Sequence, residues 1–133
     1  MNGFINSRFI ILKCKYDNGI EYFNFLFENP DDPLKLIIFE FESLEKLDYA
    51  IKNFTKVSEK TYSNDIFNIN FRLGYDENLG ILRIIKEDEG VLKISNDYIT
   101  EEKYIFEVHS KLLDGVYRLE YENETQLWIF KKL

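Results

Sequence analysis

The chain has 133 residues, a formal net charge of −7 and a hydrophobic fraction of 45%. We expect a single domain over residues 1–133, because a chain of this length can bury a core without disulfides or a structural metal. The composition excludes a disordered chain, and the acidic balance argues against direct binding to nucleic acid or to an anionic membrane.

The first third of the chain shows the two-residue period of β-strands. Alternating apolar residues predict strands at Phe9 to Tyr16, Ile20 to Glu28 and Leu34 to Glu42. Asp17-Asn18-Gly19 tolerates positive φ and predicts a tight turn after the first strand. Short connections of this kind favour antiparallel pairing.

The apolar period then becomes helical. Apolar residues recur at spacings of three and four, at Leu44, Leu47, Ile51 and Phe54. Ser43 is a suitable N-cap for a helix that begins here. The spacing predicts one main helix at about 43–55, packed on the sheet.

Strand patterns resume after this helix, beginning with alternation from Phe67 to Leu73. Two hairpins are then expected, the first around Glu87-Asp88-Glu89-Gly90 and the second across Asn123-Glu124-Thr125. Their strands are Ile81–Lys86 with Val91–Ser95, and Val116–Glu122 with Leu127–Lys132.

Residues 100–113 fit either a helix or a strand, because their apolar residues match both periods. Asp114-Gly115 is typical of a tight hairpin turn, which favours the strand. His109, the only histidine, then lies opposite Phe106 and Val108, on the solvent side.

These elements predict an α+β fold that is mostly β. We expect a twisted antiparallel sheet, or an incomplete barrel, of about eight strands with the helix at 43–55 on one face.

Few residues could support catalysis. The chain has one histidine and one cysteine, so neither a zinc site nor a disulfide within the chain can form. Cys14 alternates with Ile10 and Leu12, as a small core residue does, and a lone cysteine favours a reducing, cytoplasmic location. No phosphate-binding glycine pattern and no nucleophile elbow occurs. We therefore expect no catalytic residues, no metal and no cofactor, and the chain is not expected to be an enzyme.

Acidic residues cluster on the outer faces of two predicted strands. Such stripes are usually the solvated side of a sheet, but a stripe of one sign also attracts a basic protein partner. The candidate partner-binding residues of this kind are Glu40, Glu42, Glu45, Glu120, Glu122 and Glu124.

The last strand has apolar residues on both faces. Trp128 and Phe130 alternate with Leu127 and Ile129, and a one-sided sheet cannot bury both pairs. The helix could cover one pair. Otherwise Trp128 and Phe130 would line a cavity, form a homodimer contact or anchor a protein partner.

In general character the chain is similar to the immunity proteins of bacterial polymorphic-toxin and contact-dependent-inhibition systems, which are small, acidic and non-catalytic. The resemblance lies in composition and covers no motif, so it transfers no residues. It implies an inhibitor that neutralises a nuclease-like toxin by occluding its basic active site. The alternatives are a small β module that binds an apolar ligand and a phage-type inhibitor that mimics nucleic-acid charge.

Overall fold

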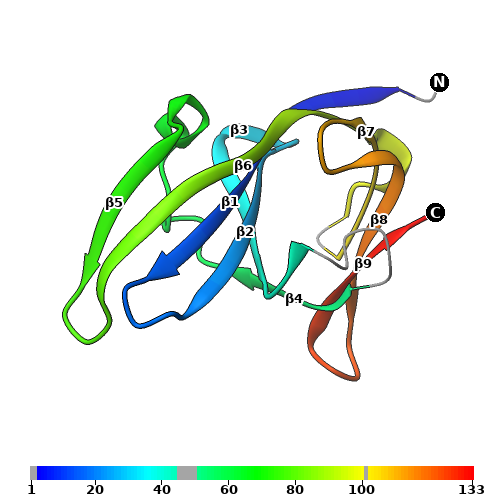
Figure 1. The fold of residues 1–133 in the computed structure, drawn as a ribbon. Coiled ribbons are helices and arrows are strands. Elements are labelled where there is room, and N and C mark those ends of the chain that lie inside the picture. The colour runs from blue at the N-terminus through cyan, green and yellow to red at the C-terminus, as the bar shows by residue number, and fades with distance from the viewer. Residues whose placement is uncertain (1–2, 45–50, 101) are drawn as a thin grey trace.

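The computed structural model describes residues 3–44, 51–100 and 102–133, in which the strands form one antiparallel sheet (Figure 1). Two short 3-10 helices, η2 (Asn64–Asn68) and η3 (Asn96–Tyr98), are present, and no α-helix occurs among these residues. The strands are β1 (Phe4–Tyr16), β2 (Glu21–Asn29), β3 (Asp32–Phe41), β4 (Ile51–Val57), β5 (Phe71–Asp76), β6 (Gly80–Ser95), β7 (Lys103–His109), β8 (Asp114–Glu122) and β9 (Leu127–Lys132).

Eight of these strands close into a barrel. Their order is β1-β2-β3-β4-β9-β8-β7-β6, and β6 pairs back with β1 from Phe4↔Ser95 to Tyr16↔Leu82. β5 lies outside the barrel on the edge of β6, at the left of Figure 1. The predicted α+β class with an open sheet or incomplete barrel is therefore wrong. The closing β1–β6 pairing joins residues far apart in the chain, which local patterns do not report.

The helix predicted at 43–55 is also wrong. Residues 45–50 lie outside the described residues, and the segment from Ile51 onward is β4, between β3 and β9. Phe54 stacks between Phe41 and Phe130, with ring centroids 4.8 and 5.0 Å away. β4 pairs with β3 over residues 55–57 and with β9 at Ile51 and Phe54, and this tertiary context overrides the helical spacing.

Two smaller predictions also change. The hairpin expected around residues 87–90 is absent, because β6 continues through these residues without a break. Glu87 instead forms a β-bulge: Asp88 pairs with Ile11 and Lys86 with Leu12, which leaves Glu87 without an opposite residue on β1. The strand expected from Phe67 begins later, at the start of β5. The preference for a strand within residues 100–113 is confirmed by β7.

Aromatic rings fill the barrel. An eight-stranded barrel encloses a space just wide enough for side chains to fill. Phe25 lies at its centre, and its ring centroid is 5.6–6.5 Å from those of five other residues: Phe9, Phe27, Phe54, Phe106 and Phe130. The large number of phenylalanines in the sequence is thus used mainly in this interior.

A second apolar layer covers the outside of β1, β2 and β3. Ile66 and Phe67, from η2, pack there with Ile10, Leu26 and Ile38. The Arg8 guanidinium lies 4.7 Å from the centroid of the Phe67 ring. The segment between β4 and β5 therefore buries the outer apolar face of β1, β2 and β3. The sequence predicts instead that a helix at 43–55 covers one face of the sheet in this way.

Candidate partner-binding site

The topology brings the two predicted acidic pairs onto one face of the barrel. β3, β4, β9 and β8 are consecutive neighbours in the sheet. Phe39 and Phe41 on β3, and Leu119 on β8, point into the core, so the alternation directs Glu40, Glu120 and Glu122 outward. Glu42 follows the end of β3 and is exposed. We call this surface the acidic wall, and it consists of Glu40, Glu42, Thr55, Glu120, Glu122, Leu127 and Ile129.

One row of residues crosses the acidic wall. Glu40 lies opposite Thr55, and Glu122 lies opposite Leu127. The pairing Phe54↔Trp128 places Thr55 beside Leu127. Three strand spacings separate the two glutamates, a distance of about 14 Å. The centre of the row is therefore an uncharged strip between two carboxylates.

Two shallow hollows mark this wall, of about 200 and 120 Å³. The first is lined by residues that include Glu40, Glu42 and Leu127, and the second by Glu120, Glu122 and Ile129. A protein side chain of moderate size would fit over each. The wall thus offers both shape and negative charge.

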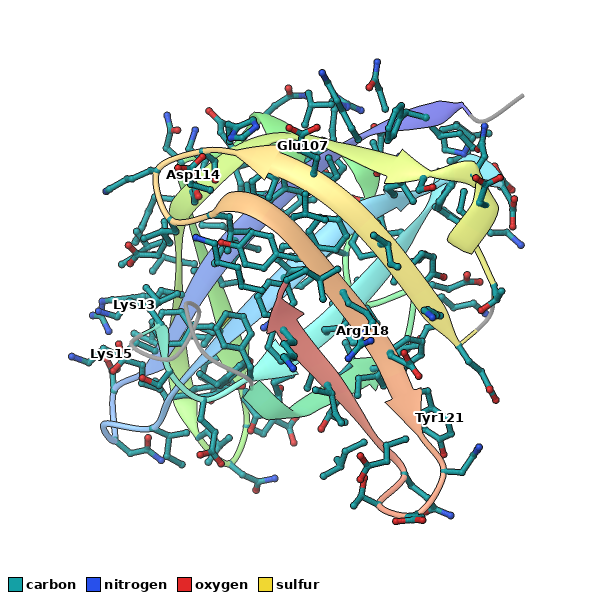
Figure 2. The ribbon with its side chains drawn as sticks, turned by 90° about the vertical axis from the view of Figure 1, so that its right-hand side faces the viewer. Lys13, Lys15, Glu107, Asp114, Arg118 and Tyr121 are labelled. Atoms are coloured by element: carbon teal, nitrogen blue, oxygen red, sulfur yellow. The ribbon has the colours of Figure 1, made fainter. Side chains whose placement is uncertain are left out.

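The cationic side chains that the structure describes accompany only the β8 side of the wall, where Arg118 lies opposite Lys131 and lines the second hollow. Glu120 lies 3.8 Å from Lys103 Nζ and 3.6 Å from Arg118 Nε, and Figure 2 shows Arg118 midway along β8. Within the described ranges, Glu42 and Glu122 form no ion pair. Exposed carboxylates without counterions attract a cationic surface over distances of about one Debye length.

The remaining predicted residues have different positions. Glu45 lies outside the described residues, and Glu124 is exposed in the turn between β8 and β9. Phe130 is fully buried in the barrel and presents no surface to a partner. Trp128 also points inward and is 5% exposed. The apolar residues of β9 that face outward are instead Leu127 and Ile129, which the sequence placed on the opposite face from Trp128.

Trp128 lines a groove at one mouth of the barrel. The groove has a volume of about 690 Å³, and its lining includes Lys56, Tyr104 and Tyr121. The ring centroid of Trp128 lies 6.2 Å from that of Tyr104 and 5.8 Å from that of Tyr121. Lys56 Nζ lies 5.9 Å from the centroid of the Trp128 ring. Asp31 and Glu102 add carboxylates at the rim. No sequence pattern predicts this groove, because its lining residues come from five separate segments.

His109 joins two carboxylates at the other end of β8. Its Nδ1 lies 2.5 Å from Asp114 Oδ1, and its Nε2 lies 2.9 Å from Glu107 Oε2. Figure 2 shows Glu107 and Asp114 near the loop between β7 and β8, far from Tyr121. The side chain is exposed, as the sequence predicted. The hydrogen bond with Asp114, followed by that with Glu107, raises the pKa of His109 above its usual 6.5.

We expect an NMR titration of the His109 ring to give a pKa above 6.5. The chain has one histidine, so the imidazole signals need no assignment. Asp114→Asn should lower this pKa more than Glu107→Gln, because Asp114 is the larger cause. The hydrogen bonds of protonated His109 with Asp114 and Glu107 stabilise the fold fully below the pKa of His109 in the unfolded chain, and this contribution disappears as the pH rises through its higher folded-state pKa. A wild-type pKa at or below 6.5 would contradict the geometry.

Cys14 is a core residue, as predicted. It is buried in the outer apolar layer, with Sγ 3.6 Å from Tyr62 Oη and 3.5 Å from Asn24 Nδ2. Burial raises the pKa of the Cys14 thiol, which disfavours the reactive thiolate. Among the described residues, no three His, Cys, Asp or Glu side chains are grouped so that they could hold a metal ion.

A scan against protein-family models finds no match to this sequence, and a search of curated proteins finds no significant match. In the part of the chain that the structure describes, no helix has the length and apolar character needed to cross a bilayer.

Proposed function

We propose that this chain is a non-catalytic binding protein that docks a basic protein partner on the acidic wall. The observation that carries this proposal is the convergence of Glu40, Glu42, Glu120 and Glu122 around Leu127 and Ile129. An apolar centre with a charged rim is the usual anatomy of a protein interface. The rigid strands hold these side chains in place, so little ordering is required when the partner binds.

We further propose that the partner is a nuclease-like bacterial toxin and that the chain acts as its immunity protein. The composition of the chain supports this choice, together with a surface whose charge complements a cleft built to hold phosphates. Inhibition would occur by occlusion, with the wall covering the cationic active site. The single buried cysteine is consistent with action in the cytoplasm.

An immunity protein is expected to have its toxin gene immediately upstream, so the first experiment is co-expression with the C-terminal domain of the protein that the upstream gene encodes. A stable complex that lacks nuclease activity is the expected result. The absence of any complex, with the domain folded and active, would refute the toxin assignment.

Charge reversal tests the wall itself. Glu42→Lys with Glu122→Lys should reduce the association rate about tenfold at low ionic strength, because steering by opposite charge is lost. Stopped-flow fluorescence with the purified toxin domain measures this rate. The effect should shrink in high salt, where exposed charges are screened.

The matched control is Glu59→Lys with Glu77→Lys. Both residues are exposed and lie outside the wall, and the pair changes the net charge by the same amount. This control should slow association much less than the wall variant. Equal rates for the two variants would show that overall charge, and not the wall, guides the partner.

Binding of a small ligand is a second candidate, favoured by the groove around Trp128. The barrel interior is packed with rings, so a ligand would have to use this groove at the mouth. Trp128 is the only tryptophan, and its fluorescence would report occupancy directly.

A further inference from the structure

β5 has an unpaired edge. Every other strand that the structure describes has at least two neighbours in the sheet, whereas β5 pairs only with β6. Figure 1 shows β5 at the margin of the molecule, with its outer side away from the barrel. An edge strand with free backbone groups is a template for another strand unless the sequence protects it.

The ladder with β6 determines which backbone groups face outward. Lys86 N donates to Asn70 O over 3.0 Å, so Asn70 faces β6. Hydrogen-bonded and non-hydrogen-bonded residues alternate along an antiparallel pair. The N–H and C=O groups of Phe71, Leu73 and Tyr75 therefore point to the free edge.

The same three residues expose apolar side chains on one face of β5. Phe71 is 54% exposed, Leu73 59% and Tyr75 75%. Ile81, opposite Tyr75 on β6, adds another exposed apolar side chain. β5 contains neither proline nor lysine, the residues that commonly protect an edge. A row of exposed apolar side chains on a free edge indicates a surface that another chain covers.

The charges on β5 match a second copy of the same strand. In an antiparallel pair of β5 strands related by a two-fold axis, residues whose backbone N–H and C=O groups point to the free edge must lie opposite one another. These are the odd-numbered residues, so each odd-numbered residue lies opposite an odd-numbered residue of the second copy. With Gly74 opposite Gly74, Leu73 faces Tyr75 of the partner subunit, and Arg72 faces Asp76 of the partner subunit. Shifting the register so that Leu73 faces itself places Arg72 opposite Gly74 and loses both ion pairs.

The Arg72 guanidinium and the Asp76 carboxylate can each form a further ion pair with a second copy of the chain. Arg72 NH2 lies 3.0 Å from Asp65 Oδ2, and its side chain is 34% exposed. The hydrogen bonds from Asn78 N and Leu79 N both end on Oδ1 of Asp76, which leaves Oδ2 to accept from a cation. Each two-fold contact therefore gives two symmetric ion pairs.

We propose that two copies of this chain associate through β5 and form one continuous antiparallel sheet across the interface. The acidic wall lies on the other side of the barrel, around β4 and β9, so the dimer presents two separate walls. This contact does not depend on the proposed toxin partner.

Sedimentation velocity over a range of concentrations tests the dimer. The wild-type chain should approach twice the monomer mass of 16.0 kDa. Arg72→Glu places like charges opposite each other at two sites and should weaken dimerisation about tenfold. Asp76→Lys should do the same. Lys35→Glu, at an exposed position on β3, is the matched control and should leave the dimer unchanged.

Mixing the two weakened variants separates this contact from a folding defect. In the mixed dimer, the carboxylate introduced by Arg72→Glu in one chain faces the ammonium introduced by Asp76→Lys in the other. The second ion pair of the interface keeps its native arginine and aspartate, so association should return. A wild-type chain that stays monomeric at every concentration would overturn the proposal. An unaffected Arg72→Glu dimer, or a mixture no more associated than its components, would overturn it equally.

Discussion

Phe25→Ala is expected to lower the free energy of unfolding by about 4 kcal/mol, near the upper end for a large-to-small substitution in a core. Phe25 is fully buried, and its ring contacts rings from five strands: β1, β2, β4, β7 and β9. Removal of the ring leaves a cavity that rigid strands on every side of the barrel cannot close. Urea unfolding, followed by the fluorescence of Trp128, measures the change.

Phe4→Ala is the matched control for this substitution. Phe4 is 63% exposed at the start of β1, so the same truncation should cost less than about 1 kcal/mol. Equal costs for the two variants would show that the interior repacks around the missing ring.

Asp88→Ala is expected to cost about 3 kcal/mol, because it removes a buried carboxylate and leaves partly buried donors without acceptors. Asp88 is 7% exposed, and Oδ2 accepts from Ser110 Oγ at 2.7 Å and from Leu112 N at 2.8 Å. Oδ1 accepts from Glu89 N at 2.8 Å and from Lys111 N at 3.3 Å. The carboxylate thus holds the loop between β7 and β8 against β6, beside the bulge at Glu87.

Urea unfolding measures the total cost, and hydrogen exchange at Leu112 N reports the local loss. Glu89→Ala is the control, because the Glu89 side chain is exposed and, among the described residues, forms an ion pair with Lys86 alone. It should change the free energy of unfolding by at most about 1 kcal/mol. Unchanged exchange at Leu112 in the Asp88→Ala chain would show that the loop does not depend on this carboxylate.

Within each strand, side-chain direction could be predicted from the sequence. Phe39 and Phe41 point inward and Glu40 outward, because successive residues of a strand face opposite sides. His109 was correctly placed on solvent for the same reason. This property is local, so it survives errors in the predicted topology.

Local patterns failed where a segment satisfied two periods. Leu44, Leu47, Ile51 and Phe54 have helical spacing, yet Ile51–Val57 is a strand. Phe54 fills a place between Phe41 and Phe130 that exists only after the other strands assemble. The sequence around Glu87 predicts a turn where the structure has a bulge, because charged residues beside a glycine are common in both.

The sequence alone predicts that the chain is dominated by antiparallel strands, that Glu40 and Glu120 lie on outer faces, and that Cys14 belongs to the core. The tertiary structure decided that β6 returns to β1 and that β4 and β9 lie between β3 and β8. Only this order brings Glu40 and Glu122 onto one surface, and only closure leaves β5 as the strand with a free edge. Strand pairing depends on contacts between distant residues, whose energy is gained only after the chain has folded back on itself.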